Sequence, residues 1–139
     1  MKRNILCIEK NRSICFLINT LFKEKYTVLT VSDNLLAMDQ INSGTEIDTI
    51  IISLENSEDE TVELLYHLGS SSLLRNIPIV VLSNSTYEEL KSVCMKSNVH
   101  AFFTKPFNPI DLIEKINQTM LIDKHSQILH NKRKVFNLN

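Results

Sequence analysis

The 139-residue chain is predicted to fold as one α/β domain, a doubly wound parallel sheet with helices on both faces, in a three-layer sandwich. The main observation is that short apolar runs of strand length alternate five times with segments of helical periodicity. Strands that alternate with helices indicate parallel pairing and right-handed crossovers. The composition supports a single globular domain, with 43% hydrophobic and 22% charged residues.

The first half of the chain supplies three predicted strands. They lie at 5–8, 26–31 and 47–54, and the third holds four isoleucines, which is typical of a strand buried on both faces. Asn11 is expected to cap the first helix. Ser32 or Asp33 is expected to cap the second helix, which should stop near Gly44.

The second half continues the alternation with two more strands, at 77–82 and 100–103. Residues 57–60 have the spacing of a capping box, which predicts the start of the third helix, and Gly69 is predicted to end it. A second capping box at 85–88 should begin the fourth helix. Asn108 followed by Pro109 is a strong start signal for the fifth.

Composition excludes several classes of function. The formal net charge of −1 argues against a general nucleic-acid binder, and two glycines cannot form a phosphate-binding glycine loop. Cys7, Cys15 and Cys94 are too widely spaced to predict a disulfide framework or a metal site. No apolar run is long enough for a signal peptide or a membrane span, so we expect a cytoplasmic protein without a membrane partner.

Polar residues lie at or just after the ends of four of the predicted strands. The carboxyl ends of parallel strands meet at one edge of a sheet, where α/β proteins bind their ligands. The residues expected at this edge are Glu9 and Lys10, Ser53, Ser83 and Lys105.

These residues and their order resemble the receiver domain of bacterial two-component response regulators, over residues 3–120. Lys105 before Pro106 matches the lysine motif of that family, Ser83 its hydroxyl after strand four, and Phe102 its switch aromatic. The resemblance implies a (βα)5 flavodoxin-like, CheY-like fold. It also implies that acidic residues after strand one hold magnesium, while an aspartate at the end of strand three accepts phosphate from a histidine kinase.

The chain departs from the family at the reacting positions. Ser53 stands where the phosphoacceptor aspartate belongs, and Glu9-Lys10 replaces the acidic pair. Magnesium needs oxygen ligands, so we expect its binding to be lost or weak, with no other cofactor and no catalytic residue. We expect Lys105 to pair with Glu9, and Lys10 to replace the metal beside it. The alternative for Ser83 is a strand-end hydroxyl bound to a backbone amide, and for Phe102 an ordinary core position.

The resemblance therefore implies a single-domain pseudo-receiver in phosphorelay-type signal transduction, which binds a signalling protein without being phosphorylated. One alternative is a receiver that still switches through another modification or ligand at the pocket. A second is a flavodoxin-like enzyme, against which the lack of a nucleophile–base pair argues.

The resemblance also implies a working surface. Receivers commonly dimerise or meet targets through the fourth helix, fifth strand and fifth helix, which here include Lys91, Met95, Phe103 and Glu114. Residues 1–121 are expected to form the domain. Residues 122–139 are expected to be a tail or helix extension, too short for a DNA-binding output domain, that adds to this contact surface.

Overall fold

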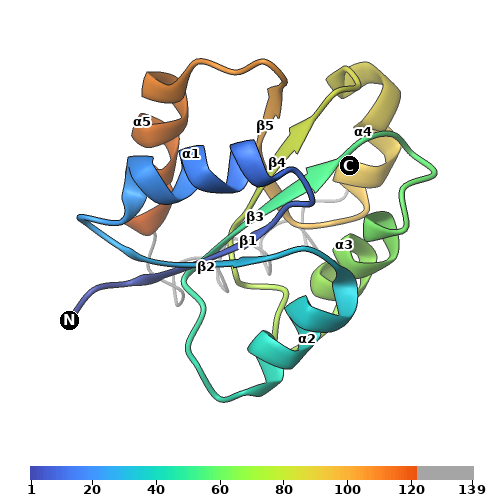
Figure 1. Cartoon of the computed structure of the whole chain (residues 1–139). Coiled ribbons are helices and arrows are strands. Elements are labelled where there is room, and N and C mark those ends of the chain that lie inside the picture. The colour runs from blue at the N-terminus through green and yellow to red at the C-terminus, as the bar shows by residue number, and fades with distance from the viewer. Residues whose placement is uncertain (122–139) are drawn as a thin grey trace.

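Five parallel strands form one sheet in the order β2-β1-β3-β4-β5 (Figure 1). The structure is a computed structural model that describes residues 1–121, and the predicted tail at 122–139 lies outside them. The strands are β1 (Asn4–Ile8), β2 (Thr27–Val31), β3 (Thr49–Leu54), β4 (Ile79–Ser83) and β5 (Val99–Thr104). The helices are α1 (Arg12–Phe22), α2 (Asn34–Asn42), α3 (Thr61–Ser70), α4 (Tyr87–Met95) and α5 (Pro109–Met120).

The helices cover both faces of the sheet, as predicted. Helices α1 and α5 lie on one face, while α2, α3 and α4 lie on the other (Figure 1). Strand order reverses between β1 and β3, since the chain passes from β1 outward to β2 and then back to β3. The predicted fold class, a flavodoxin-like doubly wound sheet, is confirmed.

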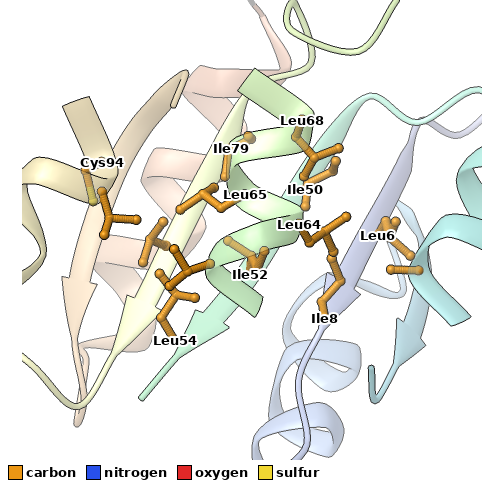
Figure 2. Close-up of a cluster of buried hydrophobic side chains, with 14 of the residues drawn as sticks. Leu6, Ile8, Ile50, Ile52, Leu54, Leu64, Leu65, Leu68, Ile79 and Cys94 are labelled. Atoms are coloured by element: carbon orange, nitrogen blue, oxygen red, sulfur yellow. The ribbon is translucent and has the colours of Figure 1, made fainter. Parts of the chain in front are cut away.

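The apolar strands feed two cores because successive side chains of a strand point to opposite faces. Ile50 and Ile52 of β3 lie beneath Leu64, Leu65 and Leu68 of α3, as Figure 2 shows. Ile51, between them, belongs instead to the core under α1 and α5. Burying each such side chain is worth about 1.5–3 kcal/mol, so a strand apolar at every position stabilises both layers.

The predicted caps at Asn11 and Asn108 are confirmed, and of the two candidates for α2 it is Asp33, not Ser32, that caps the helix. The side chains of Asn11, Asp33 and Asn108 each accept a hydrogen bond from a backbone N–H in the first turn of α1, α2 and α5. These caps satisfy amides that have no partner within the helix. Helix α2 ends at Asn42, and Gly44 follows with a φ of +87°, in the left-handed region that suits glycine.

The prediction for the start of α3 is wrong. This helix begins at Thr61, and the preceding Glu60 makes no side-chain cap. The Asp59 carboxylate instead closes the loop between β3 and α3, accepting from the N–H groups of Glu55 and Thr61. The box expected at 85–88 is also displaced, since the hydroxyl of Thr86 caps α4.

Gly69 does not end α3, which continues through Ser70. A β-carbon at this position would lie 2.8 Å from the Cα of Ser97, a backbone atom of the turn between α4 and β5. Gly69 is therefore required by the close approach of two segments rather than by the end of a helix.

The three cysteines are free. Burial raises the pKa of the Cys7 thiol far above its ordinary value, so it behaves as a small core residue. Within residues 1–121, no helix combines the length and apolar character needed to cross a membrane.

Candidate functional site

A cavity of about 320 Å³ opens at the carboxyl ends of the strands. Glu9 and Lys10 follow β1, Ser53 lies near the end of β3, and Lys105 follows β5, and all four line this cavity. The sequence prediction that they meet at one edge is confirmed for these four. Neither Ser83 nor Phe102 lines the cavity.

Glu9 and Lys105 form an ion pair inside the cavity. The Nζ of Lys105 lies 2.8 Å from Oε1 of Glu9, and the two side chains are only 16% and 4% exposed. The predicted pairing is thus present. In such a site each charge is stable mainly because the other is there, since an unpaired buried charge is costly.

Backbone contacts hold this ion pair in place. The N–H of Lys105 donates to the carbonyl of Ser83 over 2.7 Å, which fixes the start of the β5–α5 loop against β4. The Sγ of Cys15, in α1, donates to the carbonyl of Glu9 over 3.3 Å. Burial raises the pKa of this Cys15 thiol, so the thiol stays protonated and able to donate.

Lys10 does not contact Glu9, so the expectation that it replaces a metal beside that carboxylate is wrong. Its ammonium lies 3.2 Å from Oε1 of Glu60, on the outer rim of the cavity, and both side chains are exposed. The hydrogen bond to Glu60 raises the pKa of Lys10. Glu60 precedes α3, and its carboxylate reaches Lys10 because the β3–α3 loop folds over the end of β1.

The hydroxyl of Ser53 lies in the wall of this cavity. Its Oγ is buried and has no hydrogen-bond partner within the described residues. A buried hydroxyl without a partner costs free energy unless a water or ligand reaches it. Ser53 therefore marks the part of the cavity where a polar atom would be accommodated.

Ser83 is fully buried and accepts a hydrogen bond from the N–H of Ser85 over 3.0 Å. This contact matches the alternative interpretation of Ser83, in which its hydroxyl lies at the end of a strand and binds a backbone amide. Phe102 lies on the α4 side of β5, half-buried, with its ring edge-on to that of Tyr87 at 5.5 Å between centroids. Both residues thus have structural roles on the same side of the sheet as α4.

Several residues that line the cavity were not predicted at this edge, among them Asp59 and Asn84. Burial acts to raise the pKa of Asp59, but the N–H groups of Glu55 and Thr61 outweigh it, and the net pKa is lowered. Asn84 directly follows β4, a position that the strand-end argument could have included. Asp59 carried no such signal because it lies five residues beyond its strand.

The positions that would hold a magnesium ion carry a mixed set of side chains. Magnesium requires several oxygen ligands in near-octahedral geometry. The positions that would supply these ligands hold the Glu9 carboxylate, the Ser53 hydroxyl and the Lys10 ammonium. The Glu9 carboxylate is already bound to Lys105. Across residues 1–121, no group of three or more His, Cys, Asp or Glu side chains is arranged to hold a metal ion.

The fold and this edge of the sheet define a doubly wound α/β protein whose strand-end pocket carries a lysine from the β5–α5 loop. The chain belongs to the response regulator receiver domain family, whose model matches residues 5–117. Domains of this family act in two-component signalling.

The curated relatives that the chain matches are longer than the chain itself. The two-component response regulator ORR7 of Oryza sativa subsp. japonica is 30% identical over 71% of this chain and 47% of its own. The phosphate regulon transcriptional regulatory protein PhoB of Escherichia coli is 26% identical over 86% of this chain and 52% of its own. The chain thus spans about half the length of these relatives.

Solved structures share the fold. The phosphorylated cyanobacterial phytochrome response regulator RcpA is 25% identical with a TM-score of 0.69, over 84% of this chain and 89% of that one. The chemotaxis response regulator CheY4 of Vibrio cholerae is 21% identical with a TM-score of 0.74, over 86% of this chain and 99% of that one.

Proposed function

We propose that this receiver domain is a pseudo-receiver, which binds a signalling partner without being phosphorylated. The observation that carries the proposal is Ser53 at the acceptor position, beside a Glu9 carboxylate already bound to Lys105. The cation that would grip a phosphoryl group is neutralised within the protein. We propose that the pocket keeps this single arrangement.

The chemistry of Ser53 supports the same conclusion. A carboxylate that attacks phosphorus forms a high-energy acyl phosphate, whereas a serine hydroxyl that does so forms a stable phosphate ester. The hydroxyl must also lose its proton during attack. No base accepts a hydrogen bond from Ser53 within the described residues. Magnesium, which would neutralise the incoming phosphate, finds no carboxylate at positions 10 and 53, so we propose that its binding is lost or weak.

Incubation with acetyl phosphate and magnesium tests this proposal. We expect no hydroxylamine-labile phosphate on the wild-type chain. We also expect no structural change when beryllofluoride is added. The variant Lys10→Asp/Ser53→Asp restores both missing carboxylates and should gain label, which shows that the assay can detect it. Ser53→Asp alone should gain less, since Lys10 still lines the cavity. Label on a carboxylate of the wild-type protein would contradict the proposal.

The partner surface that we propose is the face formed by α4, β5 and α5, including Lys91, Met95, Phe103 and Glu114. Met95 is an apolar side chain that is 71% exposed on this face. We propose a signalling protein or a second copy of the chain as the partner, in the bacterial cytoplasm, with no nucleic acid bound. Sedimentation velocity of the wild type and of Met95→Asp tests whether a second copy of the chain binds to this face. Loss of a dimer in the variant is the expected result.

One observation favours a second candidate, a receiver switched by a ligand at the pocket. The buried Oγ of Ser53 has no partner among the described residues, beside a cavity large enough for a small polar molecule. Ser53→Ala removes the unpaired hydroxyl. If the cavity holds only water, the variant should be as stable as the wild type or slightly more stable. Marked destabilisation of protein isolated from cells, but not of refolded protein, would indicate a bound ligand. No observation favours a flavodoxin-like enzyme.

A further inference from the structure

Strand β2 forms an outer edge of the sheet. It stands first in the order β2-β1-β3-β4-β5, so within residues 1–121 no strand pairs with its outer side. Thr27 and Thr30 are exposed, and the three apolar residues of the strand are only half-buried. None of the five residues of β2 is charged or a proline, the residue types that usually protect a sheet edge from added strands. This edge is therefore suited to pairing with a further strand.

The backbone of β2 presents hydrogen-bonding groups on that outer side. The N–H of Thr27 donates toward β1, to the carbonyl of Arg3, and the register with β1 is regular along the whole strand. Because the backbone groups of successive residues in a strand point to opposite sides, the N–H and C=O of Val28 and Thr30 point outward. The other edge strand, β5, is less regular, since its register against β4 shifts. Such irregularities discourage added strands, so β2 is the better edge.

We propose that a second copy of this chain pairs with β2 in antiparallel orientation, about a two-fold axis at Leu29. This axis sets Val28 of one copy opposite Thr30 of the other, and the outward N–H and C=O groups of these two residues satisfy each other. The two Leu29 residues face each other as a non-hydrogen-bonded pair, on the side of the sheet where Leu29 already packs against the core under α2 and α3. The same patch serves both copies, so the contact is closed and gives a dimer with one continuous sheet.

The charges at the two ends of β2 favour this occupant and this direction. Lys25 lies two residues before the strand and Asp33 two residues after it, and both are exposed. Antiparallel pairing sets the start of one strand beside the end of the other, so Lys25 of each copy lies near Asp33 of the other copy. Within its own chain Lys25 donates to Asn117, and one oxygen of Asp33 accepts from the N–H of Leu36. An ammonium has three donors and a carboxylate has two oxygens, so each keeps capacity for a partner.

The helices beside β2 extend the same surface. Val28 packs against the core under α1, and Leu29 packs against the core that includes α2, so these two helices flank the strand on opposite faces of the sheet (Figure 1). The two-fold axis places each helix next to its counterpart in the second copy. Both helices carry large exposed apolar side chains, Phe16 on α1 and Leu35 and Leu36 on α2. Exposed apolar groups on both flanking helices are typical of an interface between proteins.

This surface is distinct from the face that we propose for partners. β2 and β5 are the two opposite edges of the sheet, so a dimer through β2 leaves α4, β5 and α5 exposed on both copies. The inference does not rest on the absence of phosphorylation or on the contact at Met95. A readout specific to position 29 therefore tests it separately from the proposed function.

Disulfide trapping of the full chain tests the pairing. In Leu29→Cys the two new thiols lie across the two-fold axis, where Cα atoms are about 4.5 Å apart, within the range of a disulfide. With copper phenanthroline as oxidant, we expect a covalent dimer joined through position 29. The wild type, with three free cysteines, is one control, and Leu73→Cys is the matched control because its 88% exposed position favours chance collisions. If Leu29→Cys is unfolded, a mixture of Val28→Cys and Thr30→Cys tests the same register, because these positions lie opposite each other.

Two charge variants in the Leu29→Cys background make the result specific. Lys25→Glu replaces two attractive pairs by two repulsive pairs and should lower the yield of trapped dimer about tenfold at limiting protein concentration. Lys91→Glu, on α4, makes the same change of charge away from β2 and should leave the yield unchanged. Circular dichroism checks that each variant is folded. The proposal is overturned if Leu29→Cys gives no more dimer than Leu73→Cys, or if Lys25→Glu lowers the yield no more than Lys91→Glu.

Discussion

At the scale of single residues, the buried pair of Glu9 and Lys105 is the clearest target. Lys105→Met keeps the length of the side chain but leaves the Glu9 carboxylate buried without a partner. We expect a loss of about 3 kcal/mol in the free energy of unfolding, measured by urea denaturation at neutral pH. The double variant Glu9→Gln/Lys105→Met removes both charges and should recover most of that loss.

Lys10→Met is the matched control for this experiment, because it makes the same substitution at the other cavity lysine. Lys10 pairs with Glu60 in solvent, so the melting temperature should match the wild type at low and high salt. A large loss of stability in Lys10→Met, or no loss of stability in Lys105→Met, would contradict this prediction. Either result would mean that Lys105 is not the main group that stabilises the buried carboxylate of Glu9.

A second prediction at this scale concerns Asp59 and pH. Its pKa in the folded protein lies below the ordinary value of 3.8, so its stabilising effect is complete above that value and lost as pH falls through the folded-state pKa. Asp59→Asn should cost on the order of 1 kcal/mol at pH 6, because two backbone N–H groups lose a charged acceptor. The difference between variant and wild type should narrow as pH falls below the ordinary value of 3.8. Glu58→Gln, in the same loop, is the matched control variant.

At the scale of elements, the approach of α3 to the α4–β5 turn depends on Gly69. Alanine is the better helix former by about 1 kcal/mol, yet its β-carbon would lie 2.8 Å from the Cα of Ser97. The steric term should prevail because a backbone atom cannot move aside as a side chain can. Gly69→Ala is therefore expected to destabilise by about 1–3 kcal/mol in urea denaturation. Ser70→Ala, on the exposed side of the same helix, is the control, and a stabilised Gly69→Ala would show that α3 shifts freely.

At the scale of the whole molecule, the two cores share one sheet and should unfold together. Leu65→Ala removes packing under α3, and Ile116→Ala removes packing under α5. Each should cost about 2–5 kcal/mol, with one transition common to far-ultraviolet circular dichroism and tyrosine fluorescence. Leu73→Ala, at a side chain 88% exposed, is the control. Separate transitions in either core variant would show that the layers are independent.

The sequence by itself determined the order of strands and helices, since the spacing of apolar residues follows directly from the periodicity of each element. It also determined that Glu9, Lys10, Ser53 and Lys105 would meet, because every parallel strand ends at the same edge of the sheet. The caps at Asn11, Asp33 and Asn108 were equally readable, since a cap and its amide lie within three residues.

Only the tertiary structure decided which charges pair and where backbones come close. Lys105 binds Glu9, but Lys10 binds Glu60, and that choice depends on how the β3–α3 loop folds over β1. Asp59 closes that loop in place of the predicted capping box, and Gly69 meets Ser97 in place of ending a helix. Such contacts join residues far apart in the chain at distances set by packing, and no local periodicity encodes a distance across the fold.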